Sequence, residues 1–283
     1  MRSNRIPQCL FGMVLFAVVH TTAVHAQTPS PTPSLESEFF KNILSDQKAI
    51  WTAPFHLQRS DTKWVVPSGI GLMALITTDR ITGDEIFEAN RQVKASRDVS
   101  YAGSLYGLGA VATTFYLIGR KNNNYRARET GLLSAEALIN SAIAGTVLKG
   151  ITQRARPLAG RERSEFFDGG NSFPSGHSTQ AWAVAAVIAS EYKHRPAVKL
   201  AAYGIASAVS VARFTGHKHY LSDVLAGSAL GYSIGKFVFN AHHRESADSD
   251  DGEIAISRPA WPLITPQFNR TTRQYGIALT WNF

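Results

Sequence analysis

The chain has 283 residues, with 29 lysines and arginines against 21 aspartates and glutamates, and a formal net charge of +8. That length suits one large domain or two small ones with a substantial core, and a hydrophobic share of 44% argues against intrinsic disorder. The single cysteine excludes a disulfide framework and a multi-cysteine zinc site. The positive charge favours anionic partners, without choosing between phosphate groups, lipid surfaces and nucleic acid.

Residues 1–26 have the pattern of a secretory signal peptide. Arg2 and Arg5 precede an apolar run at residues 9–19 that is too short to span a bilayer, and residues 24–26 fit a cleavage site. An uncleaved N-terminal anchor is the alternative. Cleavage would remove the only cysteine, which suits an oxidising compartment, and we therefore expect an exported, periplasmic protein.

Residues 27–34 are a proline-rich linker, and residues 35–243 are predicted to form a helical domain. Apolar residues recur at helical spacing from Leu35 to Ile50, which predicts an amphipathic helix packed on the domain or, as the alternative, lying on a membrane. Six further apolar segments are rich in Ala, Leu and Gly, which favours helices over strands. These segments are residues 64–78, 99–119, 131–148, 178–190, 200–212 and 224–235.

Of the six segments, only residues 99–119 are both uncharged and long enough to span a bilayer. We therefore expect a compact helical bundle outside the membrane in preference to an embedded one. Several polar residues receive structural interpretations. Glu136 and Asn140 are interpreted as a satisfied pair in a core helix, residues 79–80 as closing a helix, and residues 242–243 as ending a helix rather than binding metal.

The chain beyond His243 changes character. Residues 244–253 form an acid-rich linker, and residues 254–283 are expected to form a small β-hairpin. Its strands are predicted at residues 254–257 and 275–283, where the second alternates between apolar and polar side chains.

Lys149 and Arg156 open the first of three clusters of reactive residues. Their spacing of seven places both on one helical face, about 10 Å apart along the axis. Pro157 disfavours helix at Arg156, so its guanidinium is expected at a helix end. Two converging cations suit a dianionic group, although a solvated basic face is the alternative.

The second cluster is Pro174-Ser175-Gly176-His177, directly before an apolar run. A glycine-containing turn that leads into a helix leaves backbone N–H groups free for an anion. His177 can exchange a proton near neutral pH. An ordinary helix cap beside a surface histidine is the alternative.

Arg213, His219 and Asp223 form the third cluster. The histidine and aspartate are four residues apart, so on a helix the carboxylate reaches one imidazole nitrogen and leaves the other free to attack or bind. A structural His–Asp pair is the alternative. His217 has the wrong spacing to Asp223 and is expected on the surface or at the rim of a pocket.

The three clusters together follow the pattern Lys-x6-Arg-Pro, Pro-Ser-Gly-His and Arg-x5-His-x3-Asp within residues 149–223. In this combination the chain resembles the type 2 phosphatidic acid phosphatase (PAP2) superfamily, which also includes bacterial class A acid phosphatases and vanadium haloperoxidases. The resemblance covers residues 100–240 and implies an all-α helical bundle, to which the sequence adds the small C-terminal β-hairpin. One position departs, since Ala212 stands where the family has a serine.

The resemblance implies a metal-independent phosphatase that hydrolyses phosphate monoesters through a phosphohistidine intermediate. His219 would attack phosphorus, Asp223 would orient His219, and His177 would protonate the leaving group before activating water. No metal ligand and no cofactor are expected. The implied phosphate-binding residues are Lys149, Arg156, Arg213, Ser175 and Gly176.

The expected substrate is a lipid phosphate such as phosphatidic acid, or a small soluble ester, with membrane-surface contact and no nucleic-acid partner. Two other functions remain as alternatives. One is a vanadate-dependent haloperoxidase in which His219 ligates vanadium. The other is a non-catalytic envelope protein, because residues 275–283 end in an aromatic residue and are similar to the last strand of outer-membrane barrels.

Overall fold

The computed structural model describes residues 35–56, 62–84, 103–157, 164–242, 263–269 and 274–280, together with residues 96, 99 and 100. The chain divides into two compact units, Met1–His243 and Arg244–Phe283. The predicted signal peptide, both predicted linkers and the strand expected at residues 254–257 lie outside the described residues.

The first unit is built from helices. All seven helices that the apolar segments predict are present, so the prediction of a mostly helical domain is confirmed. They are α2 (Leu35–Thr52), α3 (Thr62–Asp84), α5 (Leu105–Lys121), α6 (Tyr125–Thr152), α7 (Gly176–Glu191), α8 (Pro196–Thr215) and α9 (Leu221–His242), with the short 3-10 helix η2 (Ala53–His56) after α2.

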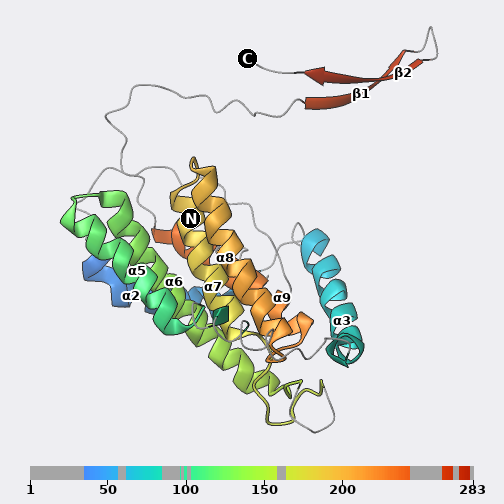
Figure 1. The fold of residues 1–283 in the computed structure, drawn as a ribbon, viewed down its shortest axis with the longest axis horizontal. Coiled ribbons are helices and arrows are strands. Elements are labelled where there is room, and N and C mark those ends of the chain that lie inside the picture. The colour runs from blue at the N-terminus through green and yellow to red at the C-terminus, as the bar shows by residue number, and fades with distance from the viewer. Residues whose placement is uncertain are drawn as a thin grey trace. The chain divides into compact units, whose positions relative to one another are not determined.

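Helix α7 is the centre of the bundle. It packs most extensively on α9 and also contacts α6 and α8, while α5 and α2 cover α6 and α3 lies against α9 (Figure 1). Every residue of α7 from Ala183 to Ser190 is buried, and so are Ser178, Thr179 and Ala181. All of these residues are Ala, Val, Ile, Ser or Thr. A helix that is apolar on all sides is expected at such a central position.

Three glycines on one face of α9 allow α7 to approach closely. A Cβ at Gly227 would lie 2.6 Å from the carbonyl oxygen of Ser175, and a Cβ at Gly231 or Gly235 would overlap a carbonyl oxygen of α7. The four-residue spacing places all three glycines along the same contact. This contact fixes the beginning of α7, with the Pro-Ser-Gly-His motif, against α9.

Helix α2 packs on α6, as expected for the amphipathic segment. Ile43 and Ile50 are buried, whereas Phe40 and Leu44 face away from the bundle and are 79% and 73% exposed. The helix therefore joins the domain by one face and leaves an apolar strip on the other.

The second unit contains two strands, β1 (Leu263–Asn269) and β2 (Gln274–Thr280), paired antiparallel with Leu263 opposite Thr280 and Asn269 opposite Gln274. The first strand includes Pro266, which has no backbone N–H to donate to the ladder. Both strands of a two-stranded ladder are edges, where a missing backbone N–H is tolerated.

Two of the described helices, α6 and α8, are long and apolar enough to cross a membrane. Buried side chains make up 61% of the apolar window of α6 and 33% of that of α8. Both helices carry charged residues, such as Glu136 in α6 and Lys199 in α8, so they are candidates in addition to the uncharged segment at residues 99–119. The corresponding helix α5 begins at Leu105, after the N-cap Ser104, and has 17 residues, fewer than the roughly 20 that a span needs.

Candidate active site

The three sequence clusters meet in space at the ends of four helices. Lys149 lies in the last turn of α6 and Arg213 in the last turn of α8, while His177 lies in the first turn of α7 and Asp223 in that of α9. His219 belongs to the turn between α8 and α9, and Arg156 to the loop after α6. The C-terminal ends of α6 and α8 and the N-terminal ends of α7 and α9 therefore bring cations, histidines and a carboxylate together.

His219 is held by a carbonyl group rather than directly by its expected aspartate. Its Nδ1–H donates to the backbone oxygen of Ser172 at 2.8 Å, while Oδ2 of Asp223 is 3.7 Å from Nδ1. The four-residue spacing does bring Asp223 within ion-pair distance of His219, although the two residues do not share a helix, since α9 begins only at Leu221. The tautomer of the ring is nevertheless the expected one, because a proton on Nδ1 leaves the lone pair on Nε2.

Burial lowers the pKa of His219 to about 4, although the neighbouring Asp223 acts in the opposite direction. The imidazole is therefore neutral at pH 7, which is the form that carries a nucleophilic lone pair. For Asp223, burial alone would raise the pKa, but His219 and Arg154 more than offset this and leave it below its usual value. The aspartate is thus an anion enclosed in the protein.

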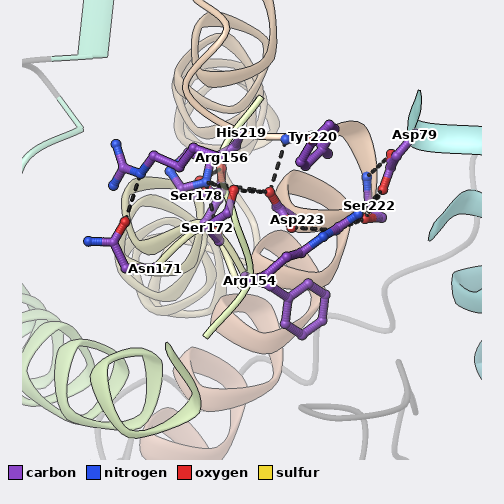
Figure 2. A network of polar contacts seen from close by, with 12 residues as sticks. Asp79, Arg154, Arg156, Asn171, Ser172, Ser178, His219, Tyr220, Ser222 and Asp223 are labelled. Atoms are coloured by element: carbon purple, nitrogen blue, oxygen red, sulfur yellow. Dashed lines mark hydrogen bonds and ion pairs between the residues drawn. The ribbon is translucent and has the colours of Figure 1, made fainter. Parts of the chain in front are cut away.

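Asp223 receives hydrogen bonds on both oxygens (Figure 2). Its Oδ2 accepts from the Ser172 hydroxyl at 2.5 Å and from the Tyr220 backbone N–H at 2.9 Å, and its Oδ1 accepts from Arg154 at 2.7 Å. Ser172 thus contacts His219 with its carbonyl and Asp223 with its hydroxyl. The sequence analysis did not select this serine, because nothing in its local sequence distinguishes it from other loop serines.

Arg154 is fully buried and connects Asp223 to α3 (Figure 2). Its second terminal nitrogen donates to Asp79 at 2.8 Å, so one guanidinium bridges two buried carboxylates. Its planar group also lies over the rings of Phe166 and Tyr220, at 4.8 and 4.5 Å from their centroids. A solvated basic face, the alternative interpretation of this cluster, therefore does not describe Arg154.

Asp79 does not close a helix, because α3 continues to Asp84. It is fully buried and accepts hydrogen bonds from the backbone N–H and the hydroxyl of Ser222 as well as from Arg154. The contact joins residues 143 positions apart, a distance at which sequence spacing carries no information. Helix α3 thereby supports the first turn of α9, on which Asp223 stands.

Lys149 and Arg156 are held on the same loop residue. The Lys149 ammonium donates to the backbone oxygen of Asn171 at 2.7 Å, and Nε of Arg156 donates to its side-chain oxygen at 2.8 Å. Burial and then the charge of Arg156 lower the pKa of Lys149 to about 8. Helix α6 ends at Thr152, so Arg156 does not share a helical face with Lys149 as the spacing predicted, but the two cations lie close enough to repel each other.

Arg213 completes a group of three cations. Burial and then the charge of Arg156 lower its pKa to about 10. Its Nε is buried and has no hydrogen-bond partner within the described part of the chain. A buried donor without an acceptor is costly, and an anion between the three cations would satisfy it.

His177 faces the same cations from the first turn of α7. Burial and then the charge of Arg213 lower its pKa to about 4, with further contributions from His219 and Lys149. Arg213 on α8, Lys149 on α6 and His219 in the turn before α9 therefore all lower the pKa of this one ring. In the absence of an anion, His177 is neutral at pH 7.

The structure corrects the expectation for Ser175. Its backbone N–H donates to the carbonyl oxygen of Asp223 at 2.9 Å, and its fully buried hydroxyl accepts from Ser178. The backbone N–H is therefore engaged with α9 and is not free for an anion. The N–H groups at the beginning of α7, starting with that of Gly176, are those that a helix leaves without an internal acceptor.

Two other polar interpretations change. His217 is 8% exposed rather than on the surface, and its Nε2 is buried with no partner among the described residues. Glu136 and Asn140 do not satisfy each other. Asn140 donates to Asp46 of α2, and Glu136 lies 3.3 Å from His242 of α9.

Comparison with known proteins bears on this arrangement. Residues 130–247 match the model of the PAP2 superfamily. The match covers less than half of the chain. All the residues of the three motif clusters lie within the matched residues, whereas Asp79 on α3 lies before them.

The chain is also similar to a curated protein, a lipid A 1-phosphatase from Porphyromonas gingivalis. It is 33% identical over 100 residues, which are 35% of this chain and 22% of that protein. The match thus spans about a fifth of the relative. A solved structure, a transmembrane PAP2 type phosphatidylglycerolphosphate phosphatase from Bacillus subtilis, aligns over 74% of this chain and 98% of its own, with a TM-score of 0.47 and 22% identity.

Proposed function

We propose that the chain is a phosphatase that hydrolyses phosphate monoesters through a phosphohistidine intermediate. The observation that carries this proposal is the group of three mutually repelling cations, Lys149, Arg156 and Arg213, with the buried, unpartnered Nε of Arg213. A phosphate dianion matches their charge. His219, with its lone pair on Nε2, supplies the nucleophile.

In the first step, Nε2 of His219 forms a bond to phosphorus as the bond from phosphorus to the ester oxygen breaks. His177 donates its proton to the departing alkoxide. The histidine ring becomes cationic on phosphorylation, and the enclosed carboxylate of Asp223 stabilises that charge. The three cations stabilise the equatorial oxygens as negative charge develops there.

In the second step, a water molecule attacks phosphorus and gives a proton to His177, while the bond from phosphorus to Nε2 breaks. Inorganic phosphate is released, and both histidines return to their starting forms. His177 thus serves first as acid and then as base. Since its first role needs a proton, the low pKa of His177 in the empty site must rise when phosphate binds.

This requirement gives a pH prediction. The pKa of His177 is about 4 because of burial and the charge of Arg213, and a bound dianion screens that charge. We expect imidazole NMR titration of the purified chain to show this pKa rising when inorganic phosphate is added. An unchanged titration of the His177 signals, assigned by their loss in His177→Asn, would contradict the acid role.

We propose that the substrate is a phospholipid-type phosphate ester at a membrane surface outside the cytoplasm. The similarity to a lipid A 1-phosphatase supports a lipid substrate. So do exposed apolar side chains, because large apolar patches mark interaction surfaces. They include Trp64, Val66, Ile70 and Met73 of α3 and Leu200, Ile205 and Val211 of α8, each more than half exposed.

The test is phosphate release by the purified chain from a chromogenic phosphomonoester and from phosphatidic acid in mixed micelles. We expect release from both, faster from the lipid, and inhibition by vanadate as an anion that mimics the transition state. Flotation with anionic vesicles measures the membrane contact separately. Absence of release from both substrates would contradict the phosphatase, and peroxide-dependent halogenation in added vanadate would replace it with a haloperoxidase.

A further inference from the structure

A second cluster of ionisable side chains lies at another place in the bundle. Asp46 of α2, Glu136 of α6 and His242 at the end of α9 meet there, with one potential ligand atom from each within 4.8 Å of the others. Glu136 is thirteen residues before Lys149 on α6, which is about 20 Å along a helix. The cluster is thus separate from the candidate active site.

The contacts of the cluster leave one oxygen unsatisfied. His242 Nε2 lies 2.7 Å from Oδ1 of Asp46 and 3.3 Å from Oε1 of Glu136. That Oε1 is buried and accepts no hydrogen bond from any described residue. Asp46 and Glu136 are each 1% exposed, so an unpartnered carboxylate oxygen points into an enclosed group of acceptors.

We propose that Asp46, Glu136 and His242 bind a divalent transition-metal cation, with Zn²⁺ the best match. Two carboxylates and one imidazole are the donors that Zn²⁺ accepts, and the imidazole disfavours Mg²⁺ and Ca²⁺, which prefer oxygen ligands alone. A water molecule would complete four-coordination.

The surrounding amides orient the carboxylate of Asp46. Asn140 donates to its Oδ2 at 2.7 Å, and Gln47 donates in turn to the amide oxygen of Asn140 at 2.8 Å. Trp51 donates to Gln47 at 3.0 Å. Such outer contacts fix the direction in which a ligand oxygen points and strengthen metal binding. The bound cation would fasten α2 to α6 and α9.

Charge balance is consistent with a dication at this position. Two carboxylates, each 1% exposed, lie side by side in the cluster, and a cation with charge +2 balances them.

The experiment is titration of the purified full chain, freed of metal by chelation, with Zn²⁺ and with Co²⁺. We expect one ion per chain, visible d–d absorption bands for Co²⁺, and a higher midpoint of thermal unfolding with Zn²⁺. Glu136→Gln should weaken binding by more than about 100-fold.

His242→Gln, at the end of its helix, is the second variant should Glu136→Gln not fold, and it should weaken binding similarly. His194→Gln, which removes an exposed histidine outside the cluster, should bind Zn²⁺ like the unchanged chain. The proposal is overturned if the unchanged chain binds no ion at one per chain, or if a folded Glu136→Gln or His242→Gln chain binds as before. Every readout is independent of phosphate release, so failure here leaves the proposed function standing.

Discussion

Replacement of His219 by alanine is expected to lower phosphate release by roughly 10⁴-fold or more, as removal of a nucleophile does in other covalent enzymes. The reason is that Nε2 of this ring is the proposed attacking atom, while Nδ1 is engaged with Ser172. Initial rates on a chromogenic ester and on phosphatidic acid measure the effect. Rapid quenching with ³²P-labelled substrate should trap acid-labile label on the unchanged chain and none on the variant.

A matched control separates chemistry from folding. His194→Ala removes an exposed histidine in the turn after α7 and should retain full activity. Because His219 is 2% exposed, the midpoint of thermal unfolding of His219→Ala is measured alongside its rate. A folded His219→Ala chain that releases phosphate as fast as the unchanged chain would rule out the phosphohistidine mechanism.

Replacement of Arg154 by methionine is expected to destabilise the fold and reduce activity together. Two buried carboxylates, Asp79 and Asp223, would lose their shared cation, and breaking a buried pair in this way costs about 3–5 kcal/mol. Asp223 would also lose the contact that sets its Oδ1. Since misplacement of a catalytic group can cost 10²-fold in rate, we expect a loss of roughly that size in kcat. Urea unfolding and steady-state kinetics measure the two effects.

The pH dependence of unfolding distinguishes this role from simple packing. The pKa of Asp223 is held below its usual value, in part by Arg154. Its contribution to stability is therefore present above the unfolded pKa of about 3.9 and lost as the pH falls through the lower folded value. In Arg154→Met that folded pKa rises, so the variant should lose stability at higher pH than the unchanged chain.

Arg154→Lys tests the geometry of the guanidinium. A lysine keeps the charge but cannot bridge two carboxylates with a planar fork or lie over two rings in the same way. We expect it to recover only part of the stability and little of the activity. Equal kinetics for Arg154→Lys and the unchanged chain would show that charge alone suffices and that Arg154 does not position Asp223.

The sequence predicted the helices well because their signal is local. Long apolar segments rich in Ala, Leu and Gly mark buried helices wherever they lie in the chain, and every such segment of the first unit is a helix. The ends were less accurate. The helix predicted to close at residues 79–80 extends to Asp84, and the run that begins at residue 99 becomes helix α5 only at Leu105. Capping and tertiary contacts decide these boundaries.

The residues of the candidate site that belong to short sequence motifs were predictable. Lys149, Arg156, His177, Arg213, His219 and Asp223 were selected from spacing alone, and the fold brings them together. The residues that hold them were not predictable. Arg154 reads as one more basic residue near a helix end, and Ser172 as an ordinary loop serine, until the fold places them against Asp223.

What the sequence by itself determined was the helical class of the domain and which residues form the candidate site, since both depend on neighbours within a few turns of helix. Only the tertiary structure decided which groups are paired. It joined Asp79 to Ser222 across 143 positions and Asp46 to His242 across 196. It also paired the backbone N–H of Ser175 with the backbone carbonyl oxygen of Asp223. The physical reason is that burial removes water as a partner, so each enclosed polar group must find one wherever the fold supplies it.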